Sequence, residues 1–336
     1  MKRSIYAIMA LSVMTWLLPA EGRQGMLCAQ SVSVNVSRGV APQAVKAVIG
    51  QQTAAFLTAI NESTLDDGKK MKDRMKALLA EKNAQSKALT NAVMDLWDQS
   101  PMYCITSEVE AEVTPYAPTG GYEMRGITVN VMEASPETAF CPLALTYDSE
   151  GNLCEVNVAL ESRLVSRAVV QGRSDTERAN RQLIVNFVES LLTGYSGKDG
   201  SLLKQVYSDD PLLLTPTGLK KKSDSRMVNA MLNGLGSERS KRASQERRDY
   251  LQQVQRMLSR APWFRIEVDD IQIMQHPMRA NFYGVSLHQR ECPTLGTDSG
   301  WLLMVFNLED PANPCLELRI WQTEGERLQI TDLNIR

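Results

Sequence analysis

The chain is poor in the residues and motifs that mark most enzyme active sites. It has only two histidines, His276 and His288, in 336 residues, and aromatic side chains make up 6%. It contains no HExxH, paired CxxC, GxSxG or Walker motif and no GxGxxG between a strand and a helix, so the common zinc, serine-hydrolase, P-loop and dinucleotide sites are not indicated. The formal net charge of -2 gives no basic footprint for nucleic acid or an acidic membrane surface. We therefore predict no cofactor, no metal and no nucleic-acid partner.

Long apolar runs are missing after the first thirty residues. Two basic residues precede an apolar stretch over 5–18, and a small residue, Ala29, follows at the position expected for cleavage, which is the pattern of a secretory signal peptide. The stretch is shorter than the ~20 residues that a membrane-spanning helix needs. We expect residues 1–29 to be a signal peptide cleaved near Ala29, and the mature chain to be periplasmic or extracellular without an integral membrane segment.

Cysteine is too sparse and too irregularly spaced for a disulfide framework. Five of the six cysteines follow the expected cleavage site, which is an odd number. Cys292 and Cys315 are expected at opposite ends of a strand meander, farther apart than the ~7 Å between Cα atoms that a disulfide allows, so both should be unpaired. One bond among Cys104, Cys141 and Cys154 stays open.

The first half changes from a helical to an alternating pattern. Apolar residues recur at helical spacing over 45–60, 71–79 and 89–97, which predicts three amphipathic helices. After Pro101 the apolar period falls to two, which predicts an antiparallel meander with one buried face. Its expected strands are 105–113, 122–132, 143–147 and 153–160. With residues 31–38 as a short polar leader, these elements form a predicted α+β domain over 30–165.

The second half repeats this order of elements and forms a predicted domain over 174–336. Ser174 and Glu177 form a capping-box pattern before a helix with an apolar stripe to Tyr195, and Gly197 should end that helix. A basic stretch over 215–245 could bind an acidic partner or a glycan, but a solvated insertion explains it better. The remaining expected elements are a short helix at 201–207, a strand at 212–214, a helix near 250–258, strands at 264–275, 282–290, 301–308 and 315–322, and a candidate fifth strand at 328–335.

Short segments of the two halves resemble each other. Pro101-Met102-Tyr103 and Pro262-Trp263-Phe264 each follow a helix and open a strand, and residues 125–129 correspond to residues 283–287. If the repeat is real, each copy is one folding unit. The alternative is that two chains with helices followed by strands resemble each other through patterning alone.

The strand at 264–275 changes its parity in the middle. Ile266 and Val268 share one face, whereas Ile271 and Ile273 continue in the opposite parity. The segment Asp269-Asp270 should therefore absorb one extra residue as a β-bulge, which bends a sheet.

The second half resembles the nuclear transport factor 2-like superfamily, a cone-shaped α+β fold in which helices pack on a bent antiparallel sheet. It also looks like an uncharacterised family of exported proteins from Bacteroides-like bacteria over about residues 175–325, and it departs from that pattern at Ser299 and Asn307, where acids are usual. The matching segments are Arg181-Gln182-Leu183-Ile184, Tyr207-Ser208-Asp209-Asp210, residues 282–289, Asp298-Ser299-Gly300 and Arg319-Ile320-Trp321-Gln322. The resemblance implies export and tandem cone domains, and it implies no activity.

One pair of side chains is a candidate for acid–base chemistry. If the hairpin pairs His276 with Phe282, then His288 stands opposite Asp270, and such a pair can transfer protons. An ordinary ion pair on the wet face of the sheet fits better, because the neighbouring residues of the same parity are polar. In this register the two histidines are roughly 20 Å apart at ~3.4 Å per residue, so they cannot share a metal ion.

The strand at 315–322 offers a candidate contact surface. Glu317, Arg319 and Trp321 share one parity, and tryptophan beside arginine on a polar face is common at protein contacts. The alternative is that Trp321 fills a gap under the C-terminal strand.

The sequence therefore favours a non-enzymatic, exported binding or assembly protein that meets a protein partner or a second copy through a sheet face. The alternative is a small-molecule-binding protein or enzyme with Asp270 and His288 inside the cone of the second domain. An enclosed cavity around those two side chains would favour the enzyme.

Overall fold

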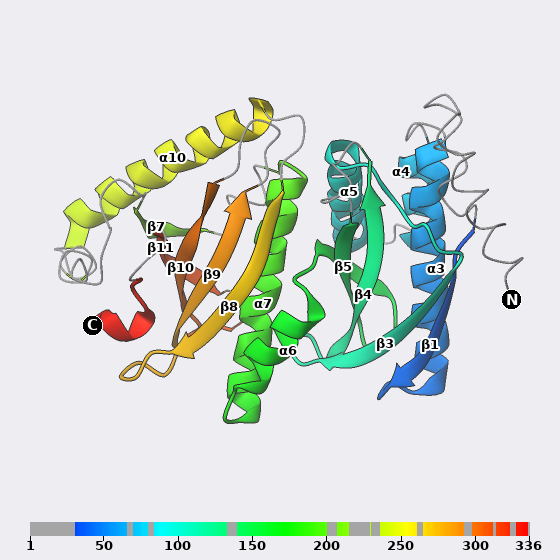
Figure 1. Cartoon of the computed structure of the whole chain (residues 1–336), viewed down its shortest axis with the longest axis horizontal. Coiled ribbons are helices and arrows are strands. Elements are labelled where there is room, and N and C mark those ends of the chain that lie inside the picture. Colours follow the sequence, from blue (N-terminus) through cyan, green and yellow to red (C-terminus); the bar gives the residue numbers. More distant parts are fainter. Residues whose placement is uncertain are drawn as a thin grey trace, which may run out of the picture.

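The computed structural model describes residues 31–65, 70–79, 84–132, 140–199, 207–214, 229, 236–260, 265–291, 298–311, 314–322 and 327–334. The chain is α+β, with two sheets and a long helix between them (Figure 1). The predicted signal peptide lies outside the described residues, and so does the first part of the basic stretch predicted at 215–245, apart from residue 229, whereas residues 236–245 belong to a helix. Within the described part, no helix is both long and apolar enough to cross a membrane.

The first unit contains the predicted helices and meander. Its elements are β1 (Ser33–Gly39), α3 (Gln43–Leu65), α4 (Met71–Leu79), α5 (Ala84–Gln99), β2 (Met102–Tyr103), β3 (Glu108–Tyr116), β4 (Gly121–Val131), β5 (Phe140–Tyr147) and β6 (Leu153–Val158). The sheet order is β1-β3-β4-β5-β6, and β2 pairs with β4. The helices cover one face of this sheet because their apolar residues, among them Met75, Leu89 and Trp97, are buried there.

The predicted polar leader at 31–38 is wrong, because this segment contains β1. The strand runs parallel to β3, and Val32 and Val36 are buried under α3. On the other face, Asn35 and Ser37 each donate a side-chain hydrogen bond to Glu110. The alternation of valine with serine and asparagine over this segment is therefore a genuine strand pattern.

The second unit begins with two helices, and its C-terminal segment packs on the face of its sheet that points away from α7. Its elements are α6 (Ser162–Val170), α7 (Asp175–Ser196), β7 (Tyr207–Leu214), α10 (Gly236–Arg260), β8 (Ile266–Gln275), β9 (Phe282–Glu291), β10 (Asp298–Asn307), β11 (Cys315–Gln322) and the 3₁₀ turn η3 (Ile330–Asp332). The strand order is β7-β11-β10-β9-β8. The expected fifth meander strand at 328–335 is wrong, because that segment forms η3 instead. Of the expected short helix at 201–207, residues 201–206 lie outside the described residues.

The N-terminus of α7 confirms part of the predicted cap. Ser174 Oγ accepts a hydrogen bond from the Glu177 N–H at 3.1 Å. The Glu177 carboxylate does not return to Ser174, and it accepts instead from the N–H of Arg173. Gly197 ends the helix as expected.

The two units share a plan and differ in connectivity. Apart from the two-residue strand β2, each sheet is a four-stranded meander with one parallel edge strand, but β1 joins the first meander strand and β7 joins the last. The matching segments 125–129 and 283–287 both lie on the second meander strand, β4 and β9. Pro262-Trp263-Phe264 lies outside the described residues.

Both faces of the second sheet are covered. Val285, Leu287 and Phe306 on one face pack in the core that α7 and α10 share. On the other face, Leu303 and Val305 pack under the C-terminal segment, which Figure 1 shows on the side of the sheet away from α7. A strand buried on both sides is expected to read as a continuous apolar run, and residues 301–306 of β10 do so.

Candidate functional site

The predicted register of the β8–β9 hairpin is confirmed. The His276 N–H donates to the Phe282 carbonyl, Asp270 stands opposite His288, and the register shifts between Val268 and Asp270, which is the expected bulge. The bulge, however, aims the two aspartates differently.

Asp270 and His288 face each other without bonding to each other. The Asp270 carboxylate pairs with Arg167 of α6. The His288 ring instead contacts Asp269, with 2.6 Å between Nδ1 and Oδ1, and its centroid lies 4.9 Å from that of Trp301. The Asp269 side chain is 70% exposed and that of His288 is 20% exposed. The imidazole could exchange a proton with Asp269, but this pair lies on the face of the sheet away from α7.

Aromatic side chains pack between α7 and the second sheet. The rings of Phe187 on α7 and Phe306 on β10 meet edge to face with centroids 4.6 Å apart. Tyr283 is buried, and its hydroxyl accepts a hydrogen bond from Asn180 of α7 at 3.1 Å. The described part of the cone is therefore a packed core at this level.

The predicted contact surface of Glu317, Arg319 and Trp321 is wrong, because two of its three members are buried. Arg319 is 7% exposed and Trp321 is 5% exposed. The register of β10 with β11 shifts at Glu317, so the residues after this bulge reverse their parity. The Arg319 guanidinium consequently stacks on the Tyr250 ring of α10, 5.1 Å from its centroid, and Trp321 joins the interior core.

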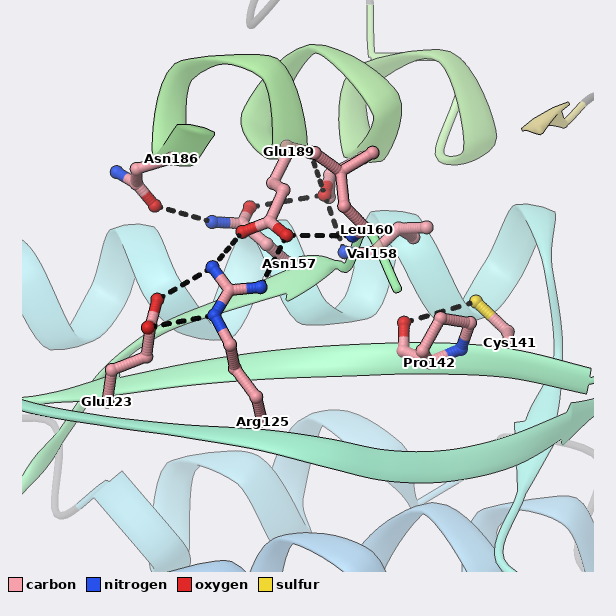
Figure 2. Close-up of polar contacts among 10 residues, drawn as sticks. Glu123, Arg125, Cys141, Pro142, Asn157, Val158, Leu160, Asn186 and Glu189 are labelled. Atoms are coloured by element: carbon pink, nitrogen blue, oxygen red, sulfur yellow. Dashed lines mark hydrogen bonds and ion pairs between the residues drawn. The ribbon is translucent and has the colours of Figure 1, made fainter. Parts of the chain in front are cut away.

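A buried charged network that the sequence did not indicate joins the two units (Figure 2). Arg125 on β4 makes two hydrogen bonds to Glu123 and two to Glu189 of α7, at 2.6–2.8 Å. The side chains of Glu189, Glu123 and Arg125 are 0%, 4% and 13% exposed. Glu189 also accepts the Leu160 N–H at 2.7 Å. A register shift after Met124, with Gly126 at a φ of 82°, forms the bulge beside which Arg125 projects toward α7.

Burial and charge act in opposite directions on the titration of this network. Burial by itself would lower the pKa of Arg125, but Glu189 and Glu123 raise it above its usual range, so the guanidinium stays charged. Burial raises the pKa of Glu189, and the bonds from Arg125 and Leu160 oppose that rise. Burial, followed by the nearby carboxylates of Glu155 and Glu123, also raises the pKa of Tyr116 on the same sheet face.

Helix α7 carries the partners of this network as a polar stripe. Asn186, Glu189, Ser190 and Thr193 are spaced as i, i+3, i+4 and i+7, and each contacts β4, β6 or the segment that follows β6. Thr193 Oγ1 accepts the Val158 N–H at 2.8 Å. Helix α7 therefore packs apolar residues on its own sheet and polar residues on the neighbouring one.

A pocket of about 410 Å³ lies where three helices end. Its lining residues come from the C-terminal parts of α5 and α10 and from the turn after α7, and they are Asp95, Asp98, Gln99, Gly197, Lys198, Asp199, Gln255, Leu258 and Ser259. Burial, then Asp199 and Asp98, raises the pKa of Asp95. Three carboxylates against one ammonium, together with the negative ends of the helix dipoles, make the pocket electronegative.

The described residues contain no group of three or more His, Cys, Asp or Glu side chains arranged to hold a metal ion. Cys104, Cys141 and Cys154 are free thiols in the structure, so none of them forms a disulfide here. Cys292 lies outside the described residues, and Cys315 begins β11.

No protein-family model and no curated protein sequence matches the chain. Among solved structures, that of Bdellovibrio bacteriovorus Bd1075 is 10% identical with a TM-score of 0.32, covering 62% of this chain and 90% of that one. The protein Rd1NTF2_04 with long sheet is 10% identical with a TM-score of 0.25, covering 40% and 96%. A putative polyketide cyclase from Bacillus cereus is 13% identical with a TM-score of 0.23, covering 44% and 76%. At these scores none of the three assigns an activity to this chain.

Proposed function

We propose that the protein is an exported, non-enzymatic binding or assembly protein of the bacterial envelope. The observation that carries this proposal is the packing of Phe187, Phe306 and Tyr283 between α7 and the second sheet, where the rival hypothesis would place a small molecule. Export is inferred from the signal-peptide pattern before Ala29, and the bacterial source from the resemblance of about residues 175–325 to an uncharacterised family of exported proteins from Bacteroides-like bacteria.

The buried junction supports a role in which the two units act as one body. The Glu123–Arg125–Glu189 network and the hydrogen bond from Ser100 Oγ to the Ser196 carbonyl both cross between the units. Charged groups without solvent hold a defined geometry, because a shift of either unit would leave a charge unpaired. A surface made from both units is therefore held in one arrangement.

The pocket between α5, α7 and α10 is the binding region that the geometry favours. It is made by both units, and its charge suits a partner that presents an ammonium or guanidinium group. We propose that such a basic group, on a protein segment or a small molecule, is what the pocket binds.

The rival hypothesis is an enzyme or carrier that uses Asp270 and His288. The 2.6 Å contact of His288 with Asp269 favours it, since a histidine paired with a carboxylate is a common proton-transfer device. Against it, the pair lies on the outer face, and Asp270 is engaged by Arg167. The rival requires a ligand to bind over that face.

A capture experiment with the mature chain tests the proposal. The bait is incubated with the envelope fraction of its own bacterium, beside a bait with Asp98→Lys. A third bait with Glu112→Lys is the matched control, because it makes the same charge change at an exposed position of β3. We expect a partner that the wild type and Glu112→Lys retain and that Asp98→Lys loses.

The outcomes separate the hypotheses. Equal capture by all three baits would place the binding region elsewhere, and no capture above an empty support would remove the protein-binding function. Native mass spectrometry of the purified chain covers the rival. A copurified ligand that His288→Gln loses and Asp98→Lys retains would replace our proposal with the carrier or enzyme. The same measurement gives the mature N-terminus, and an uncleaved chain would contradict export.

A further inference from the structure

The outer face of the second sheet is covered by a short C-terminal segment, residues 327–334, which we call the strap. Three of its side chains, Leu328, Ile330 and Leu333, are at most 4% exposed. They form a separate apolar cluster with residues of β10 and β11, which are Leu303, Val305, Leu318 and Ile320. The strap therefore covers these four sheet residues, which lie together as one apolar patch.

The seat of Ile330 is specific in shape. Gly284 lies on β9 directly under this side chain, and a Cβ built at Gly284 would stand 2.4 Å from Ile330 Cβ and 2.9 Å from its Cγ2. Glycine in the middle of a strand weakens the strand, and it marks places where another group must approach closely. Gly284 is therefore the hollow that receives the strap.

Polar contacts at both ends fix the direction of the strap. Gln322 accepts the Leu328 N–H at 2.7 Å and donates to the Leu328 carbonyl at 3.4 Å. The Arg327 guanidinium lies 3.4 Å from the centroid of Trp301 and donates to Gln272. At the other end, the buried His276 ring bonds the Leu333 carbonyl at 3.1 Å; since His276 Nδ1 accepts the Met278 N–H, its Nε2 is the donor.

The strap is attached through side chains. In the described part of the chain, each hydrogen bond between the strap and the sheet uses a side chain of the sheet or of the strap. The backbone–backbone bonds of the strap are internal to it, and the Asp332 carbonyl and the Asn334 N–H also bond the side chain of Asn229. The strap can therefore leave its seat without opening a strand ladder. A bound segment of this kind makes the same contacts whether it belongs to the same chain or to another copy.

We propose that the outer face of the second sheet is a docking surface for the strap of a second copy of this chain, and that its own strap occupies the surface when the chain is alone. A second copy is the occupant that fits this surface, because its strap carries the same Ile330 for the Gly284 hollow and the same Arg327 for Trp301. The exchange uses a surface distinct from the pocket at α5, α7 and α10 and goes beyond the proposed function. Either can fail without the other.

A complementation experiment tests the exchange. The strap variant, Leu328→Ser with Ile330→Ser, keeps an intact face but has a defective strap. The face variant, Gly284→Ala, keeps an intact strap but has a blocked face. With two different tags, each variant alone should elute at the mass of one copy, whereas the mixture should shift to the mass of two copies, because the strap of the face variant seats on the strap variant.

The controls decide between seating and non-specific association. Thr331→Ala, at an exposed position of the strap, replaces the strap variant in a parallel mixture and should give a smaller shift, because its own intact strap competes for its face. Far-UV circular dichroism establishes that each variant is folded. If both variants are folded and their mixture stays at the mass of one copy, the proposal is wrong. It is also wrong if the strap variant associates with itself when the face variant is absent.

A second measurement covers the case in which the strap variant does not fold. Two wild-type chains with different tags are incubated together and then purified through one tag. We expect the other tag to copurify after incubation, and we expect this copurification to be lost when both chains carry Gly284→Ala. Absence of copurification for the wild type, or equal copurification for Gly284→Ala, would overturn the exchange.

Discussion

Replacing Arg125 by methionine should lower the free energy of unfolding, because it breaks the charged network between the two units. The substitution removes all four hydrogen bonds that hold the carboxylates of Glu123 and Glu189, and neither carboxylate reaches solvent, at 4% and 0% exposure. Breaking a buried ion pair by removing one partner costs about 3–5 kcal/mol, because the other charge stays buried. That is a large part of the 5–15 kcal/mol that stabilises a typical folded domain, so the effect should be plain in chemical denaturation.

A matched substitution at the other side of the network should cost less. With Glu189→Gln, Arg125 keeps both bonds to Glu123, and the amide oxygen still accepts the Leu160 N–H. We expect about 1–3 kcal/mol, the cost of weakened hydrogen bonding at a buried site. The ranking of the two variants is therefore set by how many buried charges each one leaves without a partner.

Urea unfolding followed by fluorescence and circular dichroism measures both effects. Because the apolar residues of both units form one cluster, both proteins should unfold in one transition in both probes, and Arg125→Met should unfold at a lower urea concentration. A loss below about 1 kcal/mol for Arg125→Met, or a larger loss for Glu189→Gln, would refute the assignment of this network as the buried junction.

Three further predictions follow from burial and charge. Trp321→Ala should lower the free energy of unfolding by about 3–5 kcal/mol, measured in urea, because Trp321 packs in the interior core. An unchanged free energy of unfolding would contradict the buried position of Trp321. His288→Ala should change the stability by less than about 1 kcal/mol, since its partner Asp269 is 70% exposed, and a larger loss would indicate an unrecognised buried role. Although burial alone would raise the pKa of Glu177, bonds from the Arg173 N–H and Arg181 lower it below its ordinary 4.5, so its stabilisation is present above pH 4.5 and is lost as the pH falls through the lowered value. As the pH falls below 4.5, Glu177→Gln should therefore lose less stability than the wild type, measured by thermal unfolding, and an equal loss in both proteins would contradict the lowered pKa.

Local features of the sequence were sufficient to predict the main helices, the two strand meanders and the bulge in β8. The change of parity around Asp269-Asp270 predicted an extra residue in the strand. Counting back along both strands from the His276–Phe282 pair then placed Asp270 opposite His288. The same reasoning did not reveal which aspartate the imidazole bonds, because a bulge turns neighbouring side chains apart, and Arg167 comes from a helix 103 residues away in sequence. Pairing across strands is periodic, whereas side-chain partners from other elements are not.

The face of β11 could not be assigned from alternation alone. Alternation predicts one wet side, and it fails when the sheet is covered on both sides and a bulge at Glu317 reverses the parity. Two features of the sequence do indicate the covered sheet and the extra strand: the unbroken apolar run at 301–306, and the strand-like alternation of Val32, Val34 and Val36. The polar stripe of α7 was also visible as a helical spacing, but only the first sheet explains why its residues are buried.

The chemistry of the junction bears on how the two units came to act together. The apolar cluster is continuous across the two units, whereas the α7 stripe and the facing Glu123 and Arg125 form the polar part of the junction and would be solvated in separate units. Docking then exchanges water for charged hydrogen bonds, which adds little net affinity and strongly disfavours any other orientation. The shared helix supplies the attachment, because α7 belongs covalently and through its apolar side to the second sheet. Orientation by charge and attachment by a shared helix together explain how a pocket formed by α5, α7 and α10 can keep its shape although its walls come from both units.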